Sequence, residues 1–154
     1  MKRDWVRLSL AAMTLSLGGA LEELLPKFIG VGFPALFAAS AYFAAKRPPV
    51  EGLLFALIAG AAEDSLSSLP FATSMSFFAA AAVLVQRLRL PPALAPFLYG
   101  AYQLWLWVWL GSTMDGSVFS RAVAALPAGA AATFAAFWIL SWADRKGAVD
   151  EAEG

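Results

Sequence analysis

Six long apolar runs, separated by short charged or proline-rich breaks, limit what this chain can fold into. Hydrophobic residues make up 60% of the 154 positions and charged residues 14%, and the mean hydropathy is +0.69. A soluble domain of this size could not bury so much apolar surface. Because roughly 20 residues cross about 30 Å of hydrocarbon, the runs predict an all-α bundle of six transmembrane helices with short loops, over residues 5–25, 28–45, 50–62, 69–86, 92–111 and 119–142.

The basic residues give this topology an orientation. Cytoplasmic loops of membrane proteins accumulate Lys and Arg, and six spans place nine of the eleven basic residues on one side: Lys2, Arg3, Arg7, Lys46, Arg47, Arg87, Arg89, Arg145 and Lys146. The other side receives only Lys27 and Arg121, together with the acids Glu22, Glu23, Glu63, Asp64 and Asp115. We therefore expect both termini in the cytoplasm, with a single membrane domain over 1–143 and a short charged tail over 144–154.

The chain lacks the side chains of most catalytic and metal centres. It has no histidine and no cysteine, which removes the commonest proton shuttle, the thiol nucleophile and the usual ligands of transition metals. Asp115 and Arg121 only loosely match a lipid-head-group transferase, because the two downstream aspartates are missing. We expect no enzyme, cofactor or metal site. The balanced charge of eleven bases and eleven acids predicts no binding of nucleic acid.

A stripe of small residues ending in an acid is the most informative local pattern. Gly52, Ala56, Gly60 and Asp64 recur at four-residue steps, so they share one helix face against which another helix can pack closely. Asp64 fits a partner contact, a ligand or proton site, or a hydrogen bond at a helix end. Glu63 points about 100° away and is assigned to the outer surface.

Three further features complete the set of candidate residues. Pro34 predicts a kink or the first turn of the second span. In the turn after the acids, Ser68 is predicted to cap the fourth helix, with Pro70 in its first turn. Tyr102, Trp105 and Trp109 share a face of the fifth helix, which predicts either an aromatic belt at the membrane interface or a docking face for a partner's helix.

Together these residues resemble the rod-shape-determining membrane protein MreD family. The resemblance rests on Pro34 opening a span, the series Gly52, Gly60 and Asp64, and the Leu69-Pro70 turn. It covers residues 34–86 at the level of motifs and the whole chain in length and topology. The chain departs from the family pattern at Ala72, where we expect glycine, and at Glu63, where we expect an apolar residue.

The resemblance implies a non-catalytic scaffold in the bacterial inner membrane that serves the cell-elongation machinery. Such a scaffold binds MreC, and through it connects the cytoskeletal MreB with the peptidoglycan polymerase and transpeptidase. On this interpretation the contact surface comprises the small-residue stripe of the third helix and the aromatic face of the fifth: Gly52, Ala56, Gly60, Asp64, Tyr102, Trp105 and Trp109.

One alternative shares the same topology. The substrate-capturing subunit of an energy-coupling-factor vitamin transporter also has six helices. Such subunits usually carry an extracellular loop that covers a pocket, whereas every outer loop expected here is short. They also carry an Ala-x-x-x-Ala pairing motif on the first helix, to which Ala12 and Ser16 are the nearest match.

Overall fold

The computed structural model describes residues 2–29, 33–110 and 118–150, and over these residues it is helical and contains no strand. Six α-helices and one short 3-10 helix follow one another along the chain. Their bounds are α1 Lys2–Ile29, α2 Ala35–Lys46, α3 Pro49–Leu66, α4 Thr73–Leu88, η1 Pro92–Leu94, α5 Ala95–Leu110 and α6 Val118–Asp150. The predicted all-helical class is therefore confirmed.

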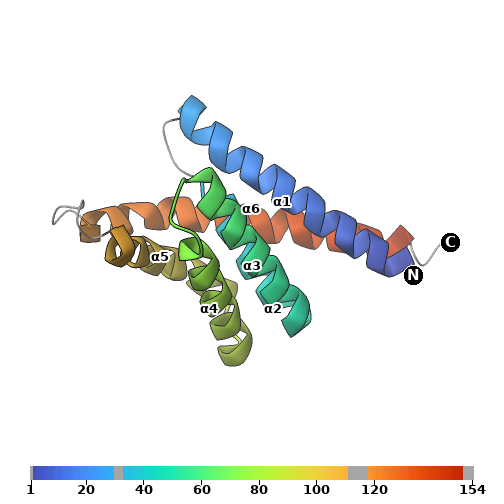
Figure 1. Ribbon diagram of the computed structural model, residues 1–154. Helices are drawn as coiled ribbons and strands as arrows, with labels where there is room; N and C mark the ends of the chain where they lie inside the picture. The colour runs from blue at the N-terminus through green and yellow to red at the C-terminus, as the bar shows by residue number, and fades with distance from the viewer. Residues whose placement is uncertain (1, 30–32, 111–117, 151–154) are drawn as a thin grey trace.

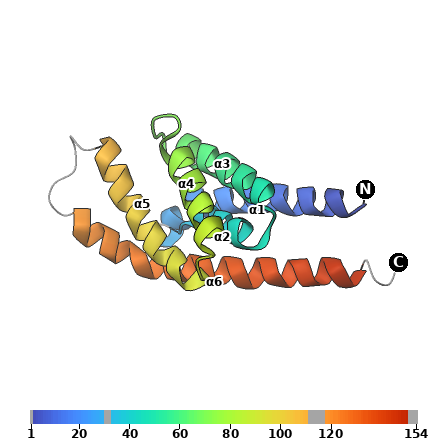
Figure 2. The same ribbon diagram turned by 90° about the horizontal axis from the view of Figure 1, so that it is seen from below.

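The helices differ sharply in their surroundings. The short α2 lies in the middle and is buried from Ala35 to Ala44, packed between α3, α6, α4 and α1. The most extensive contacts join α3 to α4 and α5 to α6. The long α1 and α6 lie on the outside, and their free ends emerge at the same end of the molecule (Figures 1 and 2). This arrangement leaves both termini on one side.

The core is an aromatic cluster around Phe37 of α2. Its ring lies 5.3 Å from that of Phe78, edge to face, 5.6 Å from Tyr99 and 6.3 Å from Tyr102, centroid to centroid. Aromatic pairs prefer such offsets and tilts because the ring edge is positive and the face negative. One side chain of α2 thereby joins α4 and α5, which explains why so short a helix can organise the bundle.

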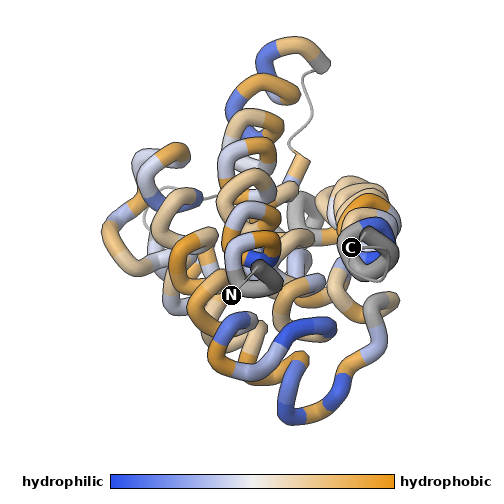
Figure 3. The backbone as a smooth tube through the Cα atoms, turned by 90° about the vertical axis from the view of Figure 1, so that its right-hand side faces the viewer, coloured by the Kyte–Doolittle hydropathy of each residue, from blue (hydrophilic) through white to orange (hydrophobic). Residues whose placement is uncertain are grey.

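Two helices have the length and composition of membrane spans. Residues Trp5–Phe28 of α1 and Val123–Lys146 of α6 are both apolar, yet only 6% and 22% of these windows are buried. Phe28 is 83% exposed and Phe134 76%, and hydrophobic residues recur along the helices (Figure 3). The core helix of a soluble protein would be mostly buried, so their exposed apolar faces make α1 and α6 candidate membrane spans.

Several predicted boundaries are wrong. The first helix extends to Ile29 rather than ending at residue 25, so the second cannot begin at 28 and starts at Ala35 instead. Pro34 stands immediately before that first turn and its carbonyl accepts the N–H of Ala38 at 3.0 Å. It opens the helix and does not kink it. The end of the fifth predicted span at 111, and Asp115, fall outside the described residues.

The charged segment after Ala143 is helical up to Asp150 and is not a separate tail, and residues 151–154 lie outside the described part. Asp144 accepts hydrogen bonds from the Tyr42 hydroxyl, at 2.5 Å, and from the guanidinium of Arg47. These contacts tie α6 to the end of α2. A local pattern could not reveal them, because about one hundred residues separate the partners.

Candidate functional site

The small-residue stripe of α3 is covered by helices of the same chain. A Cβ atom on Gly60 would lie 2.4 Å from the Cα of Met75 in α4, and one on Gly52 would lie 3.0 Å from the Cα of Ala44 in α2. Ala56, between them, is completely buried. The stripe does receive closely packed helices, but these are α2 at Gly52 and α4 at Gly60. The prediction that these residues contact another protein is therefore corrected.

Asp64 caps α4 from the preceding helix. Its Oδ1 accepts the N–H of Ser74 at 2.6 Å and its Oδ2 accepts the N–H of Met75 at 3.3 Å. The first amides of a helix have no partner within it, and the helix dipole favours an anion there. Ala72, at the N-cap position, has no side chain that could accept these bonds. Asp64 is 4% exposed, so it is a structural helix-end acceptor and offers no surface to a partner.

Ser68 and Pro70 do not begin α4, as the sequence predicts, but belong to the end of α3 and the turn after it. Ser68 has φ of 52°, and the following N–H, that of Leu69, donates to the Asp64 carbonyl at 3.0 Å. This is the six-to-one hydrogen bond that closes a helix C-terminus around a left-handed residue. The Pro70 carbonyl accepts the hydroxyl of Thr73 at 2.8 Å. The turn then reaches Ala72, whose φ of 69° explains why glycine suits that position.

The aromatic face of α5 is divided between the interior and the surface. Tyr102 is 3% exposed, and its hydroxyl lies 2.5 Å from that of Ser74. The Trp105 indole N–H donates to the Thr73 carbonyl at 3.0 Å. These two residues hold the first turn of α4, together with Asp64, and only Trp109, which is 51% exposed, remains available to lipid or a partner. The docking face is thus reduced to one of its three predicted residues.

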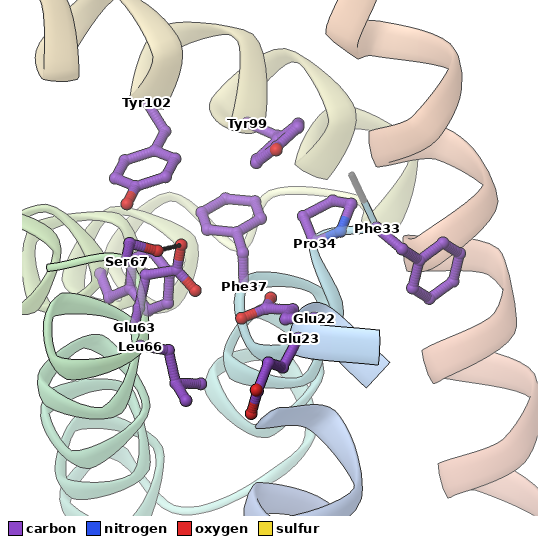
Figure 4. A pocket seen from close by; sticks show the side chains of 11 residues that line it. Glu22, Glu23, Phe33, Pro34, Phe37, Glu63, Leu66, Ser67, Tyr99 and Tyr102 are labelled. Carbon is purple, nitrogen blue, oxygen red and sulfur yellow. Dashed lines mark hydrogen bonds between the residues drawn. The ribbon is translucent and has the colours of Figure 1, made fainter. Parts of the chain in front are cut away.

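A hollow of about 220 Å³ opens beside this turn, between α1, α2, α3 and α5. In Figure 4 the side chains of Glu22 and Glu63 are directed towards it from α1 and α3. The rings around it come from the core cluster, and the full lining is Glu22, Glu23, Phe33, Pro34, Phe37, Glu63, Leu66, Ser67, Phe78, Tyr99 and Tyr102. The hollow therefore combines carboxyl groups with aromatic faces.

Glu22 plays the same part for α2 that Asp64 plays for α4. Its Oε1 accepts the N–H of Leu36 at 2.8 Å, and the N-cap residue, Pro34, again has no side-chain acceptor. The other oxygen, Oε2, is buried and has no hydrogen-bond partner among the described residues. The Glu63 carboxyl lines the same hollow. Two such groups repel unless a proton lies between them.

Glu63 is therefore not simply an outer-surface residue, as its helical direction predicts. It is half-buried, accepts the Ser67 hydroxyl at 3.2 Å and faces Glu22. The divergence of Glu63 and Asp64 is confirmed, since they serve different neighbours. The pairing of Glu63 with Glu22 spans 41 residues, and the only signal for it in the sequence is that both acids lie at the outer ends of their predicted spans.

An apolar hollow between the two exposed helices runs along α1 and α6. Its volume is about 160 Å³, its floor includes Ala35 and Ala39 of α2, and its lining is Thr14, Leu17, Gly18, Leu21, Phe33, Ala35, Ala39, Ala132, Ala135, Ala136, Ile139 and Leu140. We call this lining the α1–α6 groove. Its small residues admit the backbone of another helix to close range, and sequence analysis did not select it.

No three metal-ligating side chains gather among the described residues. The chemistry that the described surfaces offer is packing, hydrogen bonding and charge. No protein-family model, curated protein or solved structure matches this chain.

Proposed function

We propose that this chain is a six-span protein of the bacterial cytoplasmic membrane, with both termini in the cytoplasm, and that it acts as a non-catalytic scaffold of the cell-elongation machinery. The observation that carries the proposal is the pair of long, apolar and exposed helices α1 and α6 with a small-residue groove between them. The proximity of the two free ends supports an even number of crossings (Figure 1).

The four inner helices are shorter than an ideal span, with 12, 18, 16 and 16 residues in α2, α3, α4 and α5. Irregular or short elements are tolerated at membrane depth where protein, rather than lipid, surrounds them. The burial of α2 on all sides fits this condition. The caps provided by Glu22 and Asp64 satisfy helix amides that would otherwise be exposed to an apolar environment.

The partner follows from the resemblance to MreD, which points to MreC and through it to MreB and the peptidoglycan polymerase and transpeptidase. The contact surface is reassigned, because the stripe of α3 is occupied. We place the partner's membrane helix in the α1–α6 groove. Attraction between helices in lipid depends on close van der Waals packing, so the scaffold would act by positioning its partner and would transfer no chemical group.

Two tryptophan substitutions on α1 test this surface. Leu17 and Leu8 are both 60% exposed, but nine residues separate them, which places them on opposite faces of the helix. Only Leu17 lines the groove. We expect Leu17→Trp to abolish co-purification of the MreC encoded in the same genome and Leu8→Trp to leave it intact. Equal retention by both variants would exclude the groove, and a wild-type chain that fails to retain MreC would refute the scaffold.

The hollow lined by Glu22 and Glu63 supports a second candidate function, the capture of a small molecule as in a vitamin transporter subunit. Its carboxyls and aromatic rings are groups that recognise ligands. Its volume of about 220 Å³ is below the roughly 300–1,000 Å³ typical of ligand sites, which favours the scaffold. Mass spectrometry of the protein purified from a rich medium separates the two, because a retained vitamin would support the transporter.

A further inference from the structure

A third hollow, at the opposite end of α2 from the one lined by Glu22 and Glu63, is basic. It lies between the α2–α3 turn and the end of α4, has a volume of about 480 Å³, and is lined by Ala44, Ala45, Lys46, Arg47, Pro49, Val85, Gln86, Arg89, Leu90 and Pro91. We call this lining the basic hollow. Gln86 connects its two sides, since its side-chain amide donates to the Pro49 carbonyl at 3.1 Å.

Arg47 is the least exposed cation of this hollow. Its side chain is 10% exposed, and its guanidinium contacts Asp144 through Nη2 and lies 5.7 Å above the ring centroid of Phe43. Its Nε is buried and has no hydrogen-bond partner among the described residues. A buried donor without an acceptor is costly, so an anionic or carbonyl oxygen bound at the Arg47 Nε would remove this cost. The contact with Asp144 offsets one positive charge but leaves this donor unpaired.

Two further cations and a helix start add to the positive field. Lys46 and Arg89 are exposed at the rim, and Arg89 is held in a left-handed conformation with φ of 49°. The N-terminus of α3 begins at Pro49 without a side-chain cap, so its positive dipole end lies at the same place. The only acid in the first turn of α3, Glu51, faces Arg7 of α1 at 3.4 Å and does not line the hollow.

The wall of the basic hollow is apolar where it meets the helices, through Ala44, Val85 and Leu90. A free phosphate ion would use the cations and leave this wall unused. A phospholipid matches both parts, because its phosphate joins a polar headgroup to acyl chains. Anionic lipids are concentrated in the cytoplasmic leaflet, where basic pockets between membrane helices bind their headgroups.

We propose that the basic hollow binds the phosphate group of an anionic phospholipid, with Lys46, Arg47 and Arg89 as its cationic ligands. The inference rests on the membrane orientation proposed above, and it does not depend on the identity of the protein partner. Bound lipid fixes the α2–α3 and α4–α5 turns at the level of the headgroups, where it sets the depth of the bundle in the bilayer.

The test uses the full chain in nanodiscs of phosphatidylcholine to which phosphatidylglycerol is added, with bound lipid counted by native mass spectrometry. Lys46→Gln with Arg89→Gln removes two cations of the hollow, and Arg87→Gln with Arg145→Gln removes two exposed cations outside it. Arg47 stays in place because its contact with Asp144 supports the fold. At about 1 kcal/mol for each cation, we expect the first double variant to lose about 30-fold in preference for phosphatidylglycerol and the second to retain it.

Three results would overturn the proposal. Equal losses in both double variants would indicate only general surface charge, and no loss in either would exclude the hollow. Inorganic phosphate bound to the wild type in phosphatidylcholine alone, counted by the same mass spectrometry, would identify a soluble anion as the ligand. A failure of the scaffold is seen separately in the MreC co-purification. A failure of membrane insertion is seen in the protein's absence from the nanodiscs.

Discussion

The first backbone amides of α2 and of α4 both need acceptors from outside their own helix, and the two helices differ in how fully the accepting acid is used. In each, the N-cap residue has no capping side chain, and an acid from the preceding helix accepts the first amides instead: Glu22 for α2 and Asp64 for α4. Asp64 uses both oxygens on backbone donors. Glu22 uses one, and its second oxygen is buried without a donor among the described residues, in the hollow that Glu63 also lines.

Asp64 therefore serves only the structure, whereas Glu22 has one oxygen that can still accept a hydrogen bond. The α4 turn is closed, because Gly60, Tyr102 and Trp105 all contact its first residues. The α2 turn borders an open hollow. Asp64 and Glu22 therefore hold equivalent positions, but only Glu22 borders a space that could be occupied. Four substitutions test this contrast.

The largest effect is expected at Gly60, where the α4 turn has no space. The Cβ of Gly60→Ala would lie 2.4 Å from the Cα of Met75, and backbone cannot move aside as a flexible side chain can. We expect the free energy of unfolding, measured by SDS titration in detergent micelles, to fall by about 3 kcal/mol. Gly19→Ala is the control near the α2 turn, since its Cβ meets only Leu66 at 3.4 Å. Equal stability of the two variants would show that α3 and α4 are less close.

Asp64→Asn is expected to destabilise the protein by about 2 kcal/mol in the same titration, because it removes the charge and one of the two acceptors at the start of α4. The control is Glu51→Gln on the same helix, whose pairing with Arg7 is half exposed and contributes less than about 1 kcal/mol. If both variants lost the same amount, Asp64 would be an ordinary surface acid.

Glu22→Gln is expected to act in the opposite direction, with a gain of about 1 kcal/mol. The amide oxygen can still accept the N–H of Leu36, and the new amide nitrogen can donate to the Glu63 carboxyl, which lines the same hollow. Glu23→Gln, which breaks an exposed pair with Lys27 at 2.8 Å, should change stability by less than about 0.5 kcal/mol. A clear loss in Glu22→Gln would mean that the charge of Glu22 itself stabilises α2.

The smallest effect is expected at the left-handed residue before α4. Glycine avoids most of the roughly 1–2 kcal/mol that such a conformation costs an L-residue, and it adds entropy to the unfolded chain. Ala72→Gly should therefore stabilise the protein by about 0.5 kcal/mol, seen as a small rise in the thermal midpoint. Ala131→Gly, exposed within α6, should cost about 1 kcal/mol. If both glycine substitutions changed the thermal midpoint in the same direction, the left-handed conformation of Ala72 would not explain the gain.

The sequence predicts the parts of this fold that depend on local patterns. Apolar run length identifies six helices, and the spacing of Gly52, Ala56 and Gly60 correctly predicts a closely packed helix face. Spacing does not say which helix packs there, and the two neighbours along the chain, α2 and α4, occupy the face. The positive φ of Ala72 also accords with the glycine expected at that position from the resemblance.

The parts that failed depend on contacts between distant residues. Ser68 has the side chain of an N-cap, yet Asp64 caps α4 because the Ser68 backbone is used to end α3. Glu22 and Glu63 meet only after α1 and α3 pack, and Arg47 meets Asp144 only after α6 returns beside α2. The periodicity of residues within one helix does not predict contacts between side chains of different helices.

The Asp64 cap also has a consequence for biogenesis. On the membrane topology proposed above, α3 reaches the translocon before α4, and an isolated α3 would carry a carboxylate without hydrogen-bond donors into an apolar setting, which is costly. Once Ser74 and Met75 have been synthesised, their amides can compensate the carboxylate. We therefore expect α3 and α4 to enter the bilayer together as a hairpin, so that a nascent chain arrested between them inserts poorly and one arrested after α4 inserts well.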